Sequence, residues 1–330
     1  MSKVGHHITL AFKGMAMGIA EVIPGVSGGT IALITGIYEK LINTIKSFDL
    51  ELLRNLIRFR FSAVWEHING PFLTALVAGM LAGIVVGVFG VTHLMEHYPE
   101  ELWGFFFGLI LASALYVGRS VPKWGGRLLF IAILGALIAF LITQLVPAQG
   151  SGHLAYVFLS GAVAVCALIL PGISGSFILL LLGMYTVVIP ALKELLSAFD
   201  TSQLLLLAVF GLGCVTGLAT ISRVLSWMFR RYHDATLALL TGFMIGSLSK
   251  IWPWRNPIRW MDETGAISVT PLEGDGVRII AEQNVPPAMY EVADPNTLMV
   301  VVCGIAGFAI VLILARVFGS LKPGSRLQFD

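Results

Sequence analysis

Long apolar runs alternate with short polar segments along almost the whole chain. Six of these runs approach the length of about 20 residues that a helix needs to cross a bilayer. They lie at about 72–95, 102–118, 128–146, 204–228, 237–252 and 298–317. The pattern predicts an all-α polytopic membrane protein, with a polar loop at 256–295 before the last span.

Two further apolar runs are each interrupted by proline and glycine. The first is AEVIPGVSGGTIALITGIY, from Ala20 to Tyr38, and the second is ALILPGISGSFILLLLGMY, from Ala167 to Tyr185. Proline removes a backbone donor and glycine weakens a helix, so a helix that enters Pro-Gly-x-Ser-Gly should stop there. In lipid, such a break is tolerated only where protein buries it or where it lines a cavity. We therefore interpret the paired breaks as candidate binding sites rather than as packing kinks.

The lengths of the interrupted runs predict re-entrant hairpins. Residues 8–38 would extend about 46 Å as a helix, which is too short for two crossings of about 30 Å each. We therefore predict one hairpin at 8–38 and a second at 156–189, each followed by three spans. Three crossings between the hairpins make the two units, 1–150 and 151–330, inverted repeats. Such repeats are typical of transporters that alternate access around a midplane site.

The distribution of charge agrees with this topology. Basic clusters occur near 40–60, 119–127, 223–231 and 316–326, whereas 93–101 contains no Lys or Arg. Short basic loops stay in the cytoplasm, so both termini are predicted to be cytoplasmic and the acidic loop 256–295 to be extracytoplasmic.

Composition excludes several classes of protein. The chain is 57% hydrophobic and 12% charged, with a mean hydropathy of +0.87, which is unlike a soluble domain. The net charge is only +2 and no basic block is present, so we expect no nucleic-acid partner. The three cysteines stand alone in apolar runs and the histidines form no ligand-spaced cluster. We therefore expect no metal site and no cofactor.

The two broken tips carry the candidate chemistry. Free backbone N–H groups at helix ends favour an anion, hydroxyls add further donors, and phosphate is the obvious guest. The structural alternative is that the serines only cap helices and the glycines only pack them. The predicted binding residues in the tips are Pro24, Gly25, Ser27, Gly28, Gly29, Thr30, Pro171, Gly172, Ser174, Gly175 and Ser176.

Three charged residues extend this candidate site. Glu21 lies one turn before the first tip, and an acid inside a membrane is costly, so we expect it to couple the cycle to a proton or a sodium ion. A bond to the backbone or to Lys13 is the structural alternative, and the second unit has Leu168 at the matching position. Arg119 and Arg223 lie near predicted cytoplasmic helix ends, where they would either bind a phosphate or only fix orientation.

Three segments resemble the bacterial polyprenyl-phosphate transporter family of the PopT type. They are MGIAEVIPGVSGGTIALITGIYEKLI, GFFFGLILAS and LPGISGSFILLLLGMY, and the resemblance covers almost the whole chain. It implies a bacterial cytoplasmic-membrane protein that returns undecaprenyl phosphate from the outer leaflet to the inner one and is not an enzyme. It also implies that the two tips bind the lipid phosphate.

Two other functions stay open on the residues alone. A transporter for a small soluble anion or ion would use the same tips without an opening to lipid. A phosphatase is suggested by a faint likeness of Glu21 to Ser27 to the Glu-x-x-Pro-x-Ser signature of undecaprenyl-pyrophosphate phosphatases. The chain has Thr30 where that signature expects histidine, and Leu168 replaces the acid in the second copy. The oligomeric state is left open.

Overall fold

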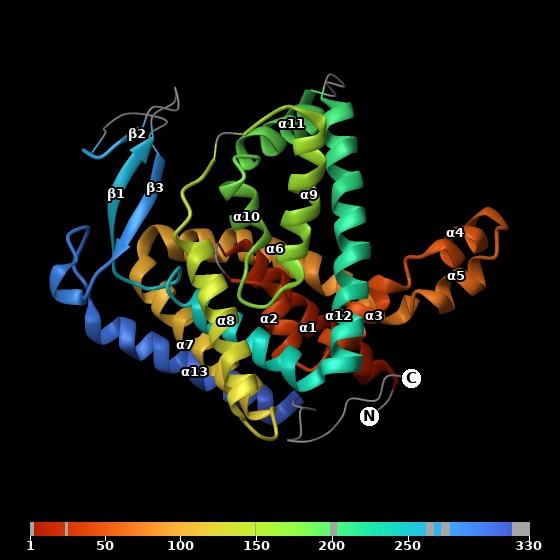
Figure 1. The fold of residues 1–330 in the computed structure, drawn as a ribbon, viewed down its shortest axis with the longest axis horizontal. Helices are drawn as coiled ribbons and strands as arrows, with labels where there is room; N and C mark the ends of the chain where they lie inside the picture. The colour runs from red at the N-terminus through yellow and green to blue at the C-terminus, as the bar shows by residue number, and fades with distance from the viewer. Residues whose placement is uncertain are drawn as a thin grey trace.

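The computed structural model describes residues 3–23, 26–148, 150–198, 203–261, 267–271 and 278–318. These residues form a mostly helical body, with a small sheet on one side and a pair of short helices projecting on the other (Figure 1). In the first half the helices are α1 (Lys3–Val22), α2 (Gly28–Ile34), α3 (Tyr38–Lys46), α4 (Leu50–Ile57), α5 (Phe61–His67), α6 (Gly70–His97), α7 (Pro99–Arg119) and α8 (Gly126–Thr143). In the second half they are α9 (Leu154–Ile169), α10 (Gly175–Leu181), α11 (Tyr185–Ala198), α12 (Leu204–Ser247) and α13 (Thr297–Phe318), with a short 3-10 helix, η1, at Pro287–Met289.

Five of the described helices are long and apolar enough to cross a membrane: α6, α7, α8, α12 and α13. α12 contains the run predicted at 204–228 and the run predicted at 237–252 as far as Ser247, and its 44 residues include a non-helical backbone at Tyr232. A helix of that length extends about 66 Å, about twice the hydrocarbon thickness. The kink at Tyr232 therefore divides α12 into a first part, 204–231, that is long enough for one crossing, and a shorter second part, 233–247.

The helices stop near the predicted breaks. α1 ends at Val22 and is followed by the seven-residue α2, while α9 ends at Ile169 and is followed by the seven-residue α10. Pro24 and Gly25 lie outside the described residues. Together α10 and α11 are apolar enough to span, but they meet at an angle of 111°.

Glycines at four-residue spacing let α1 and α6 pack closely. A side chain on Gly79 or Gly83 would clash with the backbone oxygen of Ala11 or Met15 in α1. α9 packs in the same way on the first part of α12, where Gly213 and Gly217 approach the backbone of α9. Contact of this kind is common between membrane helices, because it gains van der Waals packing without burying polar groups.

The remaining spans pair between the halves of the chain. α13 packs along α7, where Gly108 contacts the backbone of Gly304. α8 packs along the second part of α12, where Gly242 contacts the backbone of Ala132. Each half of the sequence thus supplies a helix that completes the packing of the other half.

The loop at 256–295 contains structure that the apolar pattern did not predict. Its strands β1 (Arg255–Met261), β2 (Ile267–Ser268) and β3 (Arg278–Asn284) form an antiparallel sheet in the order β2-β1-β3. The indole N–H of Trp254 donates to the Pro295 backbone oxygen at 2.8 Å, and the Tyr290 hydroxyl donates to Glu100. The sheet is therefore held against the junction of α6 and α7. We call this side of the molecule the sheet end.

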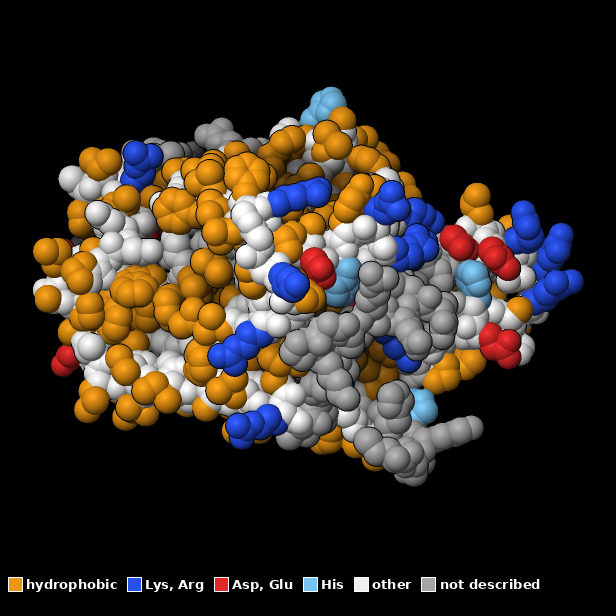
Figure 2. All heavy atoms as spheres, turned by 60° about the horizontal axis from the view of Figure 1, so that its bottom comes forward, with side chains coloured by type: hydrophobic (Ala, Val, Ile, Leu, Met, Phe, Trp, Pro, Cys, Tyr) orange, Lys and Arg blue, Asp and Glu red, His pale blue; other side chains and the backbone are white. Residues whose placement is uncertain are grey.

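The opposite side, which we call the arm end, carries the projecting pair α4 and α5. Figure 2 shows Lys and Arg side chains on and beside this pair and scattered across the middle of the face, while hydrophobic side chains dominate the part farthest from the pair. Exposed basic residues lie on the arm-end pair, in the loop between α7 and α8 and beside the kink of α12; they are Arg54, Arg58, Arg60, Arg119, Lys123, Arg127, Arg230 and Arg231.

Candidate functional site

At the first tip, side chains of the same hairpin accept hydrogen bonds from the backbone N–H groups. Ser27 caps α2, where its hydroxyl oxygen accepts the Gly29 N–H at 3.1 Å. Glu21, in the last turn of α1, accepts the Gly28 N–H through Oε1 at 2.8 Å. A Cβ on Gly28 would lie 2.6 Å from that carboxylate oxygen, so any larger residue would displace the carboxylate from this position. The tip therefore presents a carboxylate to the amide that an anion would contact.

The second tip has the same serine cap but no acid. Ser174 accepts the Phe177 N–H at 3.5 Å, and its hydroxyl also lies 2.9 Å from that of Ser176. Gly172 has a positive φ of 86°, and a Cβ there would lie 2.9 Å from the backbone of Met244. A residue other than glycine would thus meet both backbone strain and a steric clash at this turn.

The two tips contact one another directly. The Gly172 N–H donates to the Thr30 hydroxyl at 3.1 Å, and the Ser27 hydroxyl donates to the Leu168 backbone oxygen at 3.2 Å. Gly29 lies against the backbone oxygen of Ile169. Ser27, Thr30 and Ser174 are all buried. Residues about 140 positions apart in the sequence therefore form one buried polar centre.

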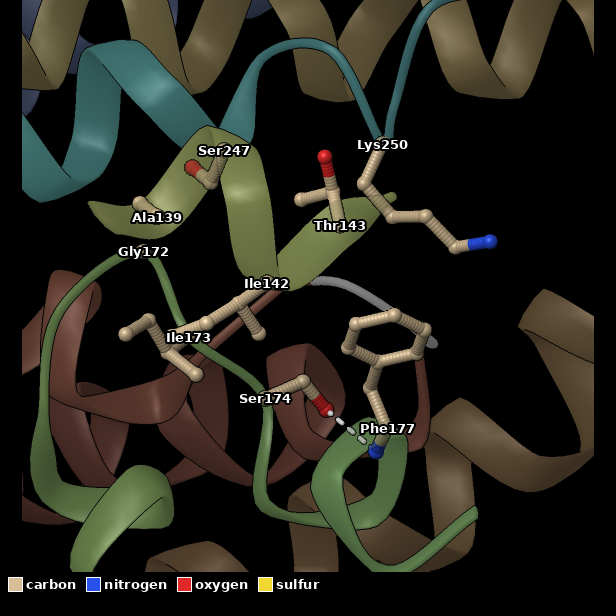
Figure 3. A pocket seen from close by; sticks show the side chains of 9 residues that line it. All are labelled: Ala139, Ile142, Thr143, Gly172, Ile173, Ser174, Phe177, Ser247 and Lys250. Carbon is tan, nitrogen blue, oxygen red and sulfur yellow. Dashed lines mark hydrogen bonds between the residues drawn. The ribbon is translucent and has the colours of Figure 1, made fainter. Parts of the chain in front are cut away.

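A small cavity touches this centre from the sheet end. It has a volume of about 10 Å³, which is room for about one water molecule. Figure 3 shows Ser174 below it, with Thr143 and Ser247 above. The lining residues that carry side-chain polar groups are Thr143, Ser174, Ser247 and Lys250.

A much larger cavity, of about 530 Å³, lies at the arm end. Leu33 and Gly36 bring the end of the first hairpin to its wall, and the Tyr38 hydroxyl donates to the Ile169 backbone oxygen at 3.1 Å. Tyr38 therefore connects this cavity to the last residue of α9, two positions before Pro171. The polar lining residues are Tyr38, Glu39, Lys40, Asn43, Thr44, Ser47, Glu66, His67 and Asn69.

Lys250 is a candidate functional residue that sequence reasoning missed. It follows α12, with its ammonium 5.0 Å from the centre of the Phe177 ring and 3.7 Å from Glu282. Glu282 is also held by Arg255 at 2.8 Å, so its contact with Lys250 is the longer of the two. Burial lowers the pKa of Lys250. A single lysine after an apolar run gives no signal in the sequence, because its nearness to Ser174 arises only in the fold.

The other predicted charged residues lie away from both cavities. Arg119 ends α7 and Arg223 lies in α12, where its guanidinium donates to the Ala219 backbone oxygen at 2.7 Å. Both are exposed, and neither lines either cavity. The tips themselves bring together the described members of the predicted set, Ser27, Gly28, Gly29, Thr30, Pro171, Gly172, Ser174 and Gly175, whereas Ser176 is exposed.

The backbone alternative for Glu21 is realised in this structure, since Gly28 is its partner. The Lys13 ammonium donates to the Thr35 backbone oxygen at 2.7 Å. Within the described ranges, no group of three or more His, Cys, Asp and Glu side chains is arranged to hold a metal ion.

Comparison with known proteins places these features in a wider group. Residues 17–269 match the model of a family described as undecaprenyl phosphate translocase-like. A polyprenyl-phosphate transporter of Vibrio cholerae is 41% identical over 318 residues, which cover 95% of this chain and 98% of that protein. A polyprenyl-phosphate transporter of Staphylococcus aureus is 32% identical over 257 residues, covering 73% and 84%. No solved structure matches the chain.

Proposed function

The chain belongs to the undecaprenyl phosphate translocase-like family, and from this premise we propose that it moves a polyprenyl phosphate across the bacterial cytoplasmic membrane. Undecaprenyl phosphate is the substrate we propose first, because the family description names it. Its phosphate must cross a medium in which charge is costly. The protein therefore has to offer the phosphate a polar path while the polyprenyl tail stays in lipid.

We propose that α1 with α2, and α9 with α10, are re-entrant hairpins that head two inverted repeats, 1–150 and 151–330. The matching close packing of α1 on α6 and of α9 on α12 supports this assignment. Seven-residue helices are too short to complete a crossing. In this arrangement the basic arm end faces the cytoplasm, together with both termini, and the sheet end faces outward.

The observation that carries the proposal is the buried contact between the tips, with a cavity on either side. Thr30 and Gly172 join the tips, the sheet-end cavity is about 10 Å³ and the arm-end cavity is about 530 Å³. We interpret this as a state closed to the outside and open towards the cytoplasm. Alternating access would reverse the two volumes by rocking the repeats about the tips.

When a phosphate binds, the backbone N–H groups of the tips would change their hydrogen-bond acceptors. The N–H groups of Gly28, Gly29 and Gly172 already donate to Glu21, Ser27 and Thr30. A phosphate oxygen would take over these donors as the tips separate, so that no buried N–H is left without a partner.

The position of Glu21 supports a role in coupling. Its carboxylate accepts the Gly28 N–H in this structure, and neutralising it with a proton or a sodium ion would favour its release. We propose that this exchange couples lipid movement to the ion.

Lys250 would receive the phosphate at the outer mouth. Its ammonium lies 3.7 Å from Glu282 and 5.0 Å from the centre of the Phe177 ring, and it lines the cavity next to Ser174. An incoming phosphate would supply a closer anionic partner for this half-buried ammonium.

The test is movement of fluorescent undecaprenyl phosphate between the leaflets of liposomes that contain the purified protein. We expect the Ser27→Ala, Ser174→Ala double variant to lose most of this movement. The matched control is Ser113→Ala with Ser222→Ala, because both hydroxyls are buried and bond only to their own helices in the described contacts. Wild-type movement by the tip variant would reject the tips as the site.

The same liposomes separate the other candidate functions. Inhibition by unlabelled lipid phosphate, but not by inorganic phosphate, is expected for a lipid transporter. Inhibition by inorganic phosphate alone would indicate a soluble-anion transporter. Release of phosphate from undecaprenyl pyrophosphate by the purified protein would indicate a phosphatase.

A further inference from the structure

The segment from Asp49 to His67, which we call the arm, exposes large apolar side chains outside the packed body. It consists of α4, a short turn and α5, and it projects away from the other helices (Figure 1). Leu50 is 80% exposed, Phe59 is 77% exposed and Ile57 is 69% exposed. The arm ends just before α6, a candidate span, so it lies at the level where that span enters the membrane.

The exposed side chains share one face of α4. Leu50, Leu53 and Ile57 are spaced as i, i+3 and i+7, which places them together, while Leu52 is buried. In α5, Phe61 and Trp65 are exposed at i and i+4. Trp65 packs partly on Gly70 at the start of α6 and is 47% exposed. Both short helices therefore present apolar side chains that the described part of the body leaves largely uncovered.

The turn between the helices has an unusual residue. The Phe59 and Arg60 N–H groups donate to the backbone oxygens of Leu56 and Asn55, which is the pattern of a Schellman turn. Phe59 has a φ of 53° at the left-handed position that glycine usually occupies. Its ring packs edge-on to Phe61, with 6.2 Å between centroids. A bulky residue thus holds a strained backbone while its side chain gains little burial, which points to a use for the exposed ring.

Charge around this apolar surface favours one kind of partner. Arg54, Arg58 and Arg60 are all exposed near the turn of the arm, whereas its acids, Asp49, Glu51 and Glu66, lie nearer its base. Arginines next to an exposed apolar face are typical of helices that lie in the interface of an anionic leaflet.

The base of the arm is fixed. Asp49 accepts the N–H groups of Glu51 and Leu52 as the cap of α4, and it lies 3.1 Å from His67 Nε2 at the end of α5. The hydrogen bond from the Leu52 N–H, first among several causes, holds the pKa of Asp49 below its ordinary value. His67 and Glu66 also line the arm-end cavity. The position of the arm therefore sets one wall of that cavity.

We propose that the arm is an interfacial anchor that inserts its apolar face into a leaflet of anionic phospholipid. Leu50, Leu53, Ile57, Phe59, Phe61 and Trp65 enter the acyl region, and the three arginines bind phospholipid phosphates. The anchor holds the mouth of the arm-end cavity at the depth of the lipid headgroups. This inference does not depend on which substrate the protein carries.

The experiment uses the full chain in nanodiscs that contain either phosphatidylcholine alone or a mixture with phosphatidylglycerol. Quenching of Trp65 by brominated acyl chains is measured as the difference between wild type and Trp65→Phe. We expect stronger quenching in the anionic discs. The Arg54→Gln, Arg58→Gln, Arg60→Gln variant should lose this dependence, with about a fivefold weaker insertion equilibrium for each arginine removed. Arg259→Gln, an exposed arginine on β1, is the matched control.

A second variant distinguishes anchoring from a purely structural role. Phe59→Gly relieves the left-handed backbone, so we expect unchanged or higher thermal stability in detergent together with weaker quenching of Trp65. If iodide in the water phase quenches Trp65 equally in both kinds of disc, Trp65 is not inserted in the anionic leaflet and the proposal is wrong. Shielding of Trp65 that appears only with two proteins per disc would also overturn it, because a second copy would then cover the arm.

Discussion

The two tips share one motif, yet the fold gives them different neighbours. At the first tip, Glu21 occupies the Gly28 N–H, and α2 leads to a cavity of about 530 Å³. At the second tip, Leu168 stands in place of the acid and the adjoining cavity is about 10 Å³. A doubled motif therefore does not make two equal sites. We interpret the first tip as the coupled half of the pathway and the second as the half that receives the phosphate.

The largest expected effect comes from forcing the tips apart. A side chain on Gly172 meets a positive φ and the backbone of Met244, and one on Gly29 meets the backbone of Ile169. We expect Gly172→Val and Gly29→Ala each to abolish lipid movement in liposomes and to cost about 1–3 kcal/mol of stability. Gly90→Ala is the control, because nothing lies within 4 Å of its added Cβ. Normal transport by both tip variants would show that the contact is dispensable.

A smaller effect is expected from removing the bond between the tips while keeping their shape. Thr30→Val leaves the buried Gly172 N–H without its acceptor, which costs about 1–3 kcal/mol. We expect a lower thermal midpoint and faster hydrogen exchange at Gly172. Thr236→Val is the matched control, because that buried hydroxyl bonds to Tyr232 in its own helix. Equal effects of the two substitutions would show that the bond between Thr30 and Gly172 contributes no more than an ordinary bond within one helix.

The role of the acid that is present at the first tip and absent from the second can be tested directly. Glu21→Gln keeps an oxygen for the Gly28 N–H but cannot ionise. We expect lipid accumulation driven by a proton or sodium gradient to fall about tenfold, a typical size for coupling between sites, while movement without a gradient persists. Leu168→Gln is the control in the second hairpin. Gradient-driven accumulation that is unchanged in Glu21→Gln would assign coupling to another residue.

The smallest effect is expected at the mouth of the second tip. Lys250→Gln should raise the lipid concentration for half-maximal movement by up to about fivefold, as expected for a partly exposed charge pair. The maximal rate should change little. Lys123→Gln, an exposed lysine in the loop between α7 and α8, provides the comparison. A reduced maximal rate without a change in half-saturation would contradict capture by Lys250.

The pH dependence of capture follows from the same residue. Burial lowers the pKa of Lys250, so its ammonium loses a proton as pH rises through a value below that of free lysine, and capture should weaken there. Lys250→Arg keeps its charge and should extend capture to higher pH. The measurement is half-saturation against pH for wild type and both Lys250 variants. Identical profiles for wild type and Lys250→Arg would exclude this titration.

The sequence predicts best what depends on local pattern. The runs at 72–95 and 298–317 fall within α6 and α13, because long apolar stretches need only lipid to become helices. The breaks in the hairpins follow from proline and glycine, and the spacing of Gly79 and Gly83 predicts close packing without naming α1 as the partner.

Features that depend on distant contacts were not predictable. The bond between Thr30 and Gly172 joins positions 142 residues apart. Lys250 becomes a candidate binding residue only because the fold places it on the same cavity as Ser174. The sheet at 255–284 arises from a polar stretch without regular alternation. The second part of α12 also ends at Ser247 rather than near 252. The roles proposed for Arg119 and Arg223 stay predictions.

The pairing of α7 with α13 has a consequence for biosynthesis. α7 ends at Arg119 and α13 begins at Thr297, so at about 5–20 residues per second a ribosome needs roughly 10 to 40 s to supply the partner. During that interval the glycine face of α7 is in the membrane without its final neighbour. A chain truncated before α13 would leave this face permanently open.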